Sequence, residues 1–427
     1  MANTFLFNSC LPSMAANSRS TPRPPTRCAR DLWDISTRIL HPEKSVTDPY
    51  GAVSSPIYQT ATFNQPSATE GGPYDYSRSG NPTRDLLEEQ IAQLDGGCRG
   101  LAFSSGMTAL VAACQLVEAG QGIVSGDDLY GGTSRLLQHI VPKQGIDVTY
   151  VDTLDLKAVE EVLKKGNISL VMLESPTNPR MQICDIRAIS KMAHDAGALV
   201  LVDNSIMASV FAQPLSLGAD ICMTSTTKFI AGHSDVTGGM LTVRDPELGK
   251  RLYFIQNAMG LHLGPFDCWL AMRGLKTMAL RVERQAENCS KLAAFLSSHP
   301  LVKKVNYPGM PDHPGHEVHF RQANSGGSLL SFTTGSLEAS KIIVEETKLF
   351  SITVSFGSVV SLISLPCFMS HASVSAELRE ARGLPDDLVR ISVGIEAIDD
   401  LLADLKQAMT KASAVLAAAG NGSDVLA

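Results

Sequence analysis

Residues 170–203 read LVMLESPTNPRMQICDIRAISKMAHDAGALVLVD, and their pattern recurs along much of the chain. An apolar run, Leu170–Leu173, is followed by an amphipathic segment, Ile183–His194, and by a second apolar run, Leu199–Val202, which Asp203 ends. Short apolar runs are typical of strands buried on both faces, whereas apolar residues three or four positions apart are typical of helices. The stretch therefore predicts a strand, a helix and a second strand.

The same alternation extends from Gly100 to Val243, with further apolar runs at Leu101–Phe103, Val148–Val151 and Ile221–Met223 and an amphipathic segment at Leu154–Leu163. Strands and helices in alternation predict an α/β fold with a mostly parallel sheet and helices on both faces. Ahead of it, Asn81 and Pro82 predict the start of a helix that Gly96 and Gly97 end.

The pattern changes after about residue 285. A helical segment includes Leu292–Leu296, and strands are predicted at Ser328–Phe332 and Leu388–Val393, ahead of a final helix. We expect this part to form a smaller C-terminal α/β domain.

Composition excludes several classes of protein. The 427 residues carry a formal net charge of -7, are 44% hydrophobic and 19% charged, and contain no long run of Lys and Arg, so we expect no nucleic-acid partner. No apolar stretch reaches the ~20 residues of a membrane helix. The nine cysteines are far apart, without a C-x-x-C pair, which predicts free thiols and no metal site.

Residues 1–30 differ from the rest of the chain. They contain no Asp or Glu and four arginines, Arg19, Arg23, Arg27 and Arg30. This composition is typical of an organellar transit peptide, although a plain disordered terminus would also fit.

Polar residues follow several of the predicted strands, where ligands of parallel sheets bind. They are Tyr130, Asn178, Asp203 and the segment Ser225–Lys228. Pyridoxal phosphate (PLP) needs a lysine for its aldehyde, a carboxylate for its ring nitrogen, an aromatic face and an anion site. This edge of the sheet offers one of each.

Lys228 has Thr227 before it and the apolar Phe229 after it, a setting that can lower an amine pKa, although a lysine is more often a solvated surface residue. Asp203 is either a helix cap or a carboxylate aimed at the ligand.

Three further positions have two interpretations each. Residues 104–108, Ser-Ser-Gly-Met-Thr, join a strand to a helix and form either an anion site or an ordinary turn. Tyr130 can stack on a ring or pack in a loop. Arg390 lies in an alternating strand and binds either a substrate carboxylate or a structural partner.

Together these motifs resemble the cystathionine-metabolising group of fold-type I PLP-dependent enzymes, and most closely the cystathionine β-lyases of plant plastids. The resemblance covers residues 54–405. It is carried by Ser55–Thr60 (SPIYQT), Tyr76–Thr83 (YSRSGNPT), Glu174–Pro179 (ESPTNP), Val202–Asn204 (VDN), Ser225–Phe229 (STTKF) and Gly232–Asp235 (GHSD).

The resemblance implies roles for individual residues. Lys228 would carry the Schiff base and, in contact with a catalytic Tyr130, transfer protons. Asp203 would pair with the ring nitrogen, and Tyr130 would also stack on the ring. Phosphate would be bound by Gly106, Met107, Ser225 and Thr227, and by Tyr76 and Arg78 of a neighbouring subunit. The substrate would be bound by Arg390, Ser355, Asn178 and the neighbouring subunit's Tyr58.

It also implies an organisation and an activity. Residues 31–92 would form an N-terminal segment contributing to the neighbouring active site, residues 93–285 the PLP-binding domain, and residues 286–427 the C-terminal domain. The chain would form a homo-oligomer, a dimer of dimers, in the chloroplast or otherwise the cytoplasm. It would cleave L-cystathionine to homocysteine, pyruvate and ammonia in methionine biosynthesis.

One segment bears on the choice within the group. Enzymes that act at the γ-carbon resemble one another in a Glu directly before the serine of a Glu-Ser-Leu-Gly-like segment, where this chain has Val354-Ser355-Phe356-Gly357. This difference favours β-elimination. Cystathionine γ-synthase and γ-lyase remain alternatives, as does a non-catalytic homologue. A departure from the group is Thr226, where alanine is commoner.

Overall fold

The computed structural model describes residues 33–41, 50–370, 372, 377, 379 and 382–422. The transit-peptide prediction for residues 1–30 lies outside them. The chain divides into one unit from Met1 to Asp34 and a second from Ile35 to Ala427, which contains the two sheets. Within the described residues, no helix is both long and apolar enough to cross a membrane.

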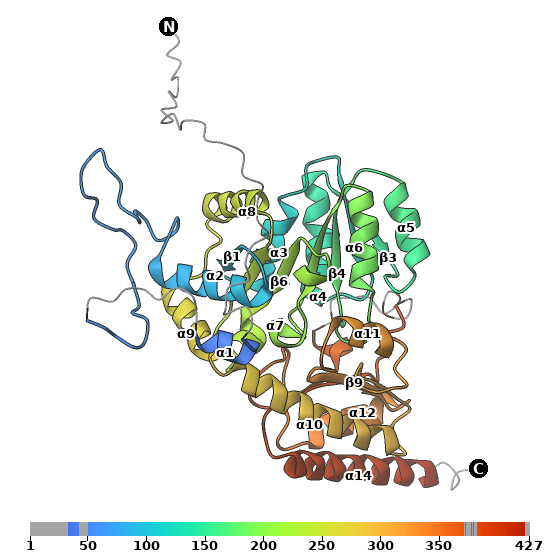
Figure 1. Ribbon diagram of the computed structural model, residues 1–427. Coiled ribbons are helices and arrows are strands. Elements are labelled where there is room, and N and C mark those ends of the chain that lie inside the picture. Colours follow the sequence, from blue (N-terminus) through green and yellow to red (C-terminus); the bar gives the residue numbers. More distant parts are fainter. Residues whose placement is uncertain are drawn as a thin grey trace. The chain divides into compact units, whose positions relative to one another are not determined.

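The larger of the two sheets has seven strands (Figure 1). Its strands lie in the order β1-β7-β6-β5-β4-β2-β3, and only β7 runs antiparallel to its neighbours. The prediction of a mostly parallel sheet is confirmed, although the sequence did not predict the direction of β7. The strands are β1 (Arg99–Phe103), β2 (Gly122–Gly126), β3 (Asp147–Val151), β4 (Ile168–Glu174), β5 (Leu199–Asp203), β6 (Ile221–Thr224) and β7 (Gly239–Val243).

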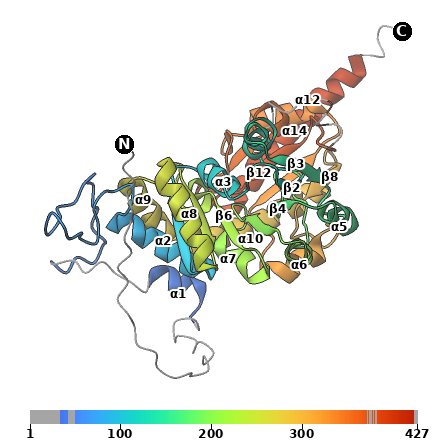
Figure 2. The same ribbon diagram turned by 90° about the horizontal axis from the view of Figure 1, so that it is seen from above.

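Both faces of this sheet are covered by helices because successive residues of each strand point to opposite sides. Leu170 and Met172 of β4 pack in one cluster with α3, α4 and α8, whereas Val171 and Leu173 pack in another with α5 and α6. Figures 1 and 2 show these layers. The helices are α1 (Ile35–Leu40), α2 (Pro82–Asp95), α3 (Gly106–Cys114), α4 (Gly131–His139), α5 (Leu156–Lys164), α6 (Ile186–Asp195), α7 (Ala208–Phe211), α8 (Pro246–Met259) and α9 (Pro265–Leu275), with short turns η2 (Val141–Gln144), η3 (Pro214–Leu217) and η4 (Thr226–Ile230).

Helix α2 begins and ends where the sequence predicts. The Asn81 side chain accepts hydrogen bonds from the backbone N–H groups of Thr83 and Arg84, and Pro82 occupies the first helical position. The helix ends at Gly96, whose φ of 73° is a left-handed conformation that favours glycine.

A second, five-stranded sheet has the order β10-β11-β12-β9-β8. Strands β9 (Leu329–Thr333) and β12 (Val389–Ser392) confirm the two predicted strands, and the others are β8 (Lys304–Asn306), β10 (Ser351–Ile352) and β11 (Leu362–Ser364). In Figure 1, α14 lies along the outer side of this sheet, next to α12. The remaining elements are α10 (Met278–Ser298), α11 (His316–Gln322), α12 (Leu337–Glu346), α14 (Ile398–Gly422) and η5 (Pro366–Phe368).

The predicted domain boundary between residues 285 and 286 falls inside α10. Met278 and Val282 of this helix pack in a cluster with α2 and α9, whereas Leu292 and Leu296 pack against the second sheet. One helix therefore serves both cores, and the division into ranges 31–92, 93–285 and 286–427 stays a prediction.

Candidate active site

Polar residues converge at the carboxyl ends of the parallel strands, as expected for this architecture. Glu174 ends β4 and Asp203 ends β5, and the two residues are opposite each other in the register of these strands. The backbone N–H of Tyr130 donates to Glu174 Oε2 over 3.2 Å. The N–H of Ser225, after β6, donates to Ser205 Oγ over 2.7 Å. Loops after β2, β4, β5 and β6 therefore meet at one edge.

Lys228 lies in η4, and its amine is held by a distant part of the chain. Its Nζ atom donates to Ser355 Oγ over 2.6 Å and lies 4.7 Å from the centre of the Phe356 ring. A Cβ atom on Gly357, whose φ is +83°, would lie 3.1 Å from the Lys228 carbonyl carbon. Glycine therefore lets this segment lie directly against the Lys228 backbone.

The environment of Lys228 favours the neutral amine. Burial and, to a smaller extent, the positive charge of Arg390 lower its pKa from 10.5 to about 8, although the charge of Asp203 opposes both effects. A neutral amine is the form that can attack an aldehyde or accept a proton. The predicted lowering of the Lys228 pKa is thus present in the structure.

Arg390 is buried in β12 and has polar partners on two sides. Its Nη1 atom donates to Asn178 Oδ1 over 3.0 Å, and its Nη2 atom donates to the carbonyl oxygen of Ser355 over 2.7 Å. Burial lowers its pKa to about 10. Across the described residues, its partners are an amide and a carbonyl oxygen and no carboxylate, and its Nε atom is buried without a hydrogen-bond partner. The guanidinium therefore keeps a charge that an anionic ligand can satisfy.

Asp203 is not a helix cap. Its Oδ1 atom accepts a hydrogen bond from the Ser205 N–H over 2.9 Å, whereas α7 begins only at Ala208, with Met207 at its N-cap. Burial raises the pKa of the Asp203 carboxyl, and hydrogen bonds from Ser205 and the charge of Lys228 oppose this. Burial and the neighbouring Asp203 charge raise the pKa of Glu174 well above its usual value. A cation placed here would favour the ionised form of Asp203.

The start of α3 lies beside the β6 loop. A Cβ atom on Gly106 would lie 3.3 Å from Ser225 Oγ, and one on Gly132 would lie 2.5 Å from the Tyr130 ring and 2.8 Å from Met107 Sδ. The first N–H groups of a helix have no intrahelical partners and attract anions. The Thr227 Oγ1 atom, in contrast, already accepts a hydrogen bond from the Gly238 N–H over 3.0 Å.

Three predicted site residues lie elsewhere. The Tyr58 backbone is bound to the first turn of α2, through its N–H and Thr83 Oγ1 at 2.9 Å. Tyr76 and Arg78 are exposed, with the Arg78 guanidinium 5.3 Å from the Tyr76 ring and its Nε donating to Asn257 Oδ1 of α8. The Tyr58 backbone is thus connected to α2 and the Arg78 side chain to α8.

Comparison with known proteins identifies the family. A model described as "Cys/Met metabolism PLP-dependent enzyme" matches residues 36–410. The chain belongs to this family. The family resemblance drawn from the motifs is therefore confirmed, and so is its implication of PLP as the cofactor.

Relatives within the Cys/Met metabolism family are close in sequence. The chain is 62% identical to the chloroplastic cystathionine β-lyase of Arabidopsis thaliana over 87% of this chain and 80% of that protein. It is 59% identical to the chloroplastic cystathionine β-lyase of Mimosa pudica over 88% and 82%. Among solved structures, a cystathionine γ-lyase from Lactobacillus plantarum, complexed with L-serine, matches with a TM-score of 0.86 at 39% identity, over 88% and 99% of the two chains. These likenesses confirm the fold-type I α/β prediction.

The residues at the strand ends suit the family's cofactor. They combine an amine with a lowered pKa, a buried carboxyl in reach of its charge, and the backbone N–H groups of the first turn of α3, of which that of Thr108 binds Ser105 Oγ. These are the groups that an aldehyde, a ring nitrogen and a phosphate require. The described chain therefore fits PLP.

Sequence reasoning missed two members of this cluster. Glu174 lies between the Tyr130 backbone and Asp203, and Phe356 lies beneath both the Lys228 amine and Arg390, whose Cζ is 6.0 Å from the ring centre. A signal existed for Glu174, since it follows Leu170–Leu173 as Asp203 follows Leu199–Val202. The unusual Thr226 is fully buried, and no hydrogen-bond partner for its Oγ1 occurs within the described residues.

Proposed function

We propose that this chain is a carbon–sulfur lyase that cleaves L-cystathionine to homocysteine, pyruvate and ammonia. The observation that carries the proposal is the arrangement of Lys228, Ser355 and Arg390, in which one serine contacts both an amine and a guanidinium. High identity to cystathionine β-lyases of two plants supports the choice of substrate.

Arg390 binds the α-carboxylate of the substrate. Asn178 and the Ser355 carbonyl hold two of its nitrogens, so the guanidinium has a fixed direction. A planar fork fixed in this way binds a carboxylate in one orientation, which brings the substrate's α-carbon toward the Lys228 amine.

Lys228 moves the proton. Its Nζ atom, oriented by Ser355 Oγ, removes the α-proton and returns a proton to the products. Bound PLP supplies the electron sink for the resulting negative charge. Asp203 would hold a proton on the cofactor's ring nitrogen, and Tyr130, whose backbone N–H donates to Glu174, would stack on the ring. Loss of the β-thiolate, which takes up a proton, gives homocysteine, and water then hydrolyses the remaining three-carbon enamine to pyruvate and ammonia.

Two sets of residues hold the phosphate. Gly106, Met107, Ser225 and Thr227 come from the same chain, at the start of α3 and in the β6 loop. Tyr76 and Arg78 come from a neighbouring copy, as Tyr58 does for the substrate, and their exposure on the α2–α8 side supports this. Each active site is then shared by two chains, which requires a homo-oligomer, for which we propose a dimer of dimers.

Val354 favours β-elimination. It is 48% exposed and directly precedes Ser355, so an uncharged side chain stands beside the lysine's hydrogen-bond partner. Elimination at the γ-carbon needs a second deprotonation, for which a carboxylate at this position would serve as a base. The alternative activities, γ-synthase and γ-lyase, occur in the names of solved structures at 38% and 39% identity, whereas the relatives at 62% and 59% identity are named β-lyases.

The test is to identify the keto acid formed from L-cystathionine. We expect pyruvate and homocysteine from the wild type and from Lys191→Ala, whose lysine is exposed and pairs with Asp195, but neither product from Lys228→Ala. Mainly 2-oxobutanoate would contradict β-cleavage but not PLP chemistry. No turnover of any thioether or activated homoserine would favour a non-catalytic homologue.

We also propose a plastid location. The two plant relatives are both named chloroplastic, and the acid-poor composition of residues 1–30 supports the same destination. Import of a fluorescent fusion that carries these residues, against one that lacks them, tests this.

A further inference from the structure

The first turn of α2 holds the backbone of the segment that precedes it. Arg84 is only 1% exposed, and it donates from Nη1 to the carbonyl oxygen of Ser77 over 2.6 Å and from Nη2 to that of Arg78 over 3.2 Å. The Nδ2 atom of Asn81 donates to Ser77 Oγ over 3.0 Å. Because a guanidinium fork is planar, two such bonds fix the direction of the chain at these carbonyls.

Tyr58 is held by the same turn. Its N–H donates to Thr83 Oγ1 over 2.9 Å, and its carbonyl oxygen accepts from Asn81 Nδ2 over 2.9 Å. Asn81, Thr83 and Arg84, which we call the α2 clamp, therefore hold both stretches of chain that carry the proposed cross-subunit residues.

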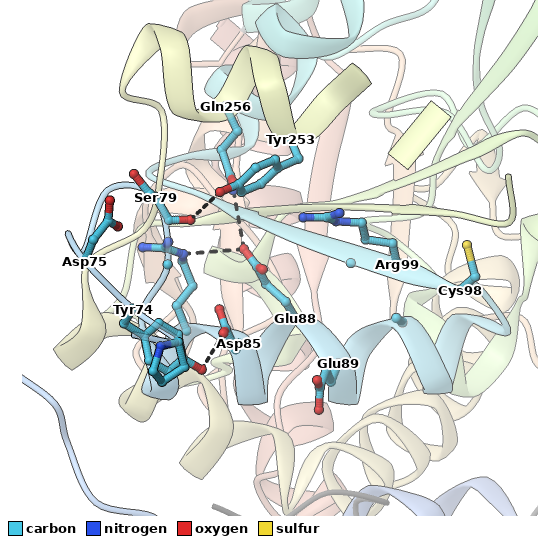
Figure 3. Close-up of a pocket in the computed structure, with 15 residues that line it drawn as sticks. Tyr74, Asp75, Ser79, Asp85, Glu88, Glu89, Cys98, Arg99, Tyr253 and Gln256 are labelled. Carbon is cyan, nitrogen blue, oxygen red and sulfur yellow. Dashed lines mark hydrogen bonds and ion pairs between the residues drawn. The ribbon is translucent and has the colours of Figure 1, made fainter. Parts of the chain in front are cut away.

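The α2 clamp is itself anchored to the edge of the large sheet. Arg84 Nε lies 3.6 Å from Glu88 Oε1, and the same oxygen accepts the Ala102 N–H over 2.8 Å. Gln256 of α8 donates to the Ala102 carbonyl oxygen over 2.8 Å. Strand β1 is an edge strand, and Glu88 satisfies its Ala102 N–H, whereas the Ala102 carbonyl oxygen also accepts the Leu263 N–H over 3.0 Å. Figure 3 shows Glu88 facing Gln256.

The neighbouring contacts hold the backbone but leave two side chains at the surface. The Tyr253 hydroxyl donates to the Ser79 carbonyl oxygen over 2.8 Å, beside a cavity of about 440 Å³ that Glu88 and Arg99 also line (Figure 3). Tyr76 is 42% exposed and Arg78 is also exposed. Because the backbone of residues 77–79 is held while the Tyr76 and Arg78 side chains are exposed, these two side chains are available to contact another molecule.

We propose that the α2 clamp is a positioning element for the neighbouring subunit's active site, with Arg84 as its main positioning residue. The inference rests on the proposed sharing of sites between chains. Holding the Ser77 and Arg78 carbonyls in place removes backbone freedom in advance, so the phosphate contacts of Tyr76 and Arg78 cost less ordering entropy when they form. Arg84 acts through them and does not touch the cofactor.

The first test compares cofactor affinity in the purified holoenzymes. Arg84→Ala is expected to weaken PLP binding about tenfold or more, whereas Arg99→Ala, which changes the same cavity without touching residues 77–78, should not. Arg84→Lys keeps the charge beside Glu88 but lacks the fork, so it should restore thermal stability without restoring PLP affinity. Wild-type PLP affinity in Arg84→Ala would overturn the proposal.

The second test determines whether Arg84→Ala impairs the active site of its own chain or that of the neighbouring chain. At limiting PLP, mixing Arg84→Ala chains with inactive Lys228→Ala chains should recover about a quarter of wild-type activity, since half of randomly exchanged dimers are hybrids with one complete site of two. Arg78→Ala mixed with Lys228→Ala is the reference. Recovery in the reference alone would overturn the role of Arg84, and failure of both mixtures would overturn the shared site itself.

A third variant covers the case in which Arg84→Ala does not fold. Thr83→Ala removes the acceptor for the Tyr58 N–H and should raise KM severalfold with PLP affinity unchanged, while Thr83→Ser should restore KM. Equal KM values for the wild type and Thr83→Ala would contradict the clamp.

Discussion

The Nζ atom of Lys228 lies 2.6 Å from the Oγ atom of Ser355, although 127 positions separate the two residues in the chain. The carbonyl oxygen of Ser355 binds Arg390 at the same time. One residue thus contacts the amine through its side chain and the guanidinium through its backbone, which allows the two functions to be separated by mutation.

Ser355→Ala should lower kcat without a matching change in KM. The hydroxyl orients the amine, and loss of a hydrogen bond to a group that becomes charged costs about 1.5–3 kcal/mol, or roughly 10- to 100-fold in rate. The carbonyl that binds Arg390 remains in the variant. Steady-state kinetics with L-cystathionine measure both constants, with the exposed Ser351→Ala as control. A raised KM at unchanged kcat would show that the hydroxyl binds substrate instead.

Covalent attachment of PLP to the apoprotein should depend on pH with a midpoint near 8. The reacting form is the neutral amine, and burial with the Arg390 charge lowers the Lys228 pKa from 10.5 to about 8. The rate should therefore rise as pH rises through 8 and level off above it. Growth of the visible absorption band measures the rate, with N-acetyl-lysine as a reference. A midpoint near 10 would be inconsistent with this environment, and Arg390→Ala should shift the midpoint upward.

Arg390→Lys should raise KM for L-cystathionine about 30-fold or more. Truncating one partner of a buried charge pair costs about 2–5 kcal/mol, and lysine cannot reach Asn178, the Ser355 carbonyl and a carboxylate with one planar group. Comparing L-cystathionine with its α-carboxamide gives the measurement. The wild type should prefer the acid strongly, and an unchanged preference in the variant would remove Arg390 from the substrate site.

Val354→Glu should shift products toward γ-cleavage or lower total activity. The new carboxylate would stand directly before Ser355, where it could serve as a second base. The ratio of 2-oxobutanoate to pyruvate measures the shift, with Val354→Gln as the uncharged control of similar size. If Val354→Glu and Val354→Gln give the same product ratio, the size of the side chain and not its charge determines the products.

Much of the fold could be predicted because its signals are local. Leu199–Val202 is apolar along its whole length because both faces of β5 are buried, and Asn81 with Gly96 mark the ends of α2 because helix ends lack backbone partners. The direction of β7 had no such signal, since strand pairing depends on distant neighbours.

The sequence by itself determined that Lys228 and Asp203 lie at strand ends, since short apolar runs place the next polar residue at the sheet's edge. It also left two interpretations of Arg390 and Asp203. Only the tertiary structure decided that Asp203 caps no helix and that Arg390 meets Asn178 across 212 positions. The Lys228 pKa likewise depends on burial and on Arg390, which β12 and the Ser355 segment bring to the loops of the first sheet. The spacing of residues along the chain does not predict such contacts, because they form only when elements that are distant in sequence pack against each other and bury their surfaces.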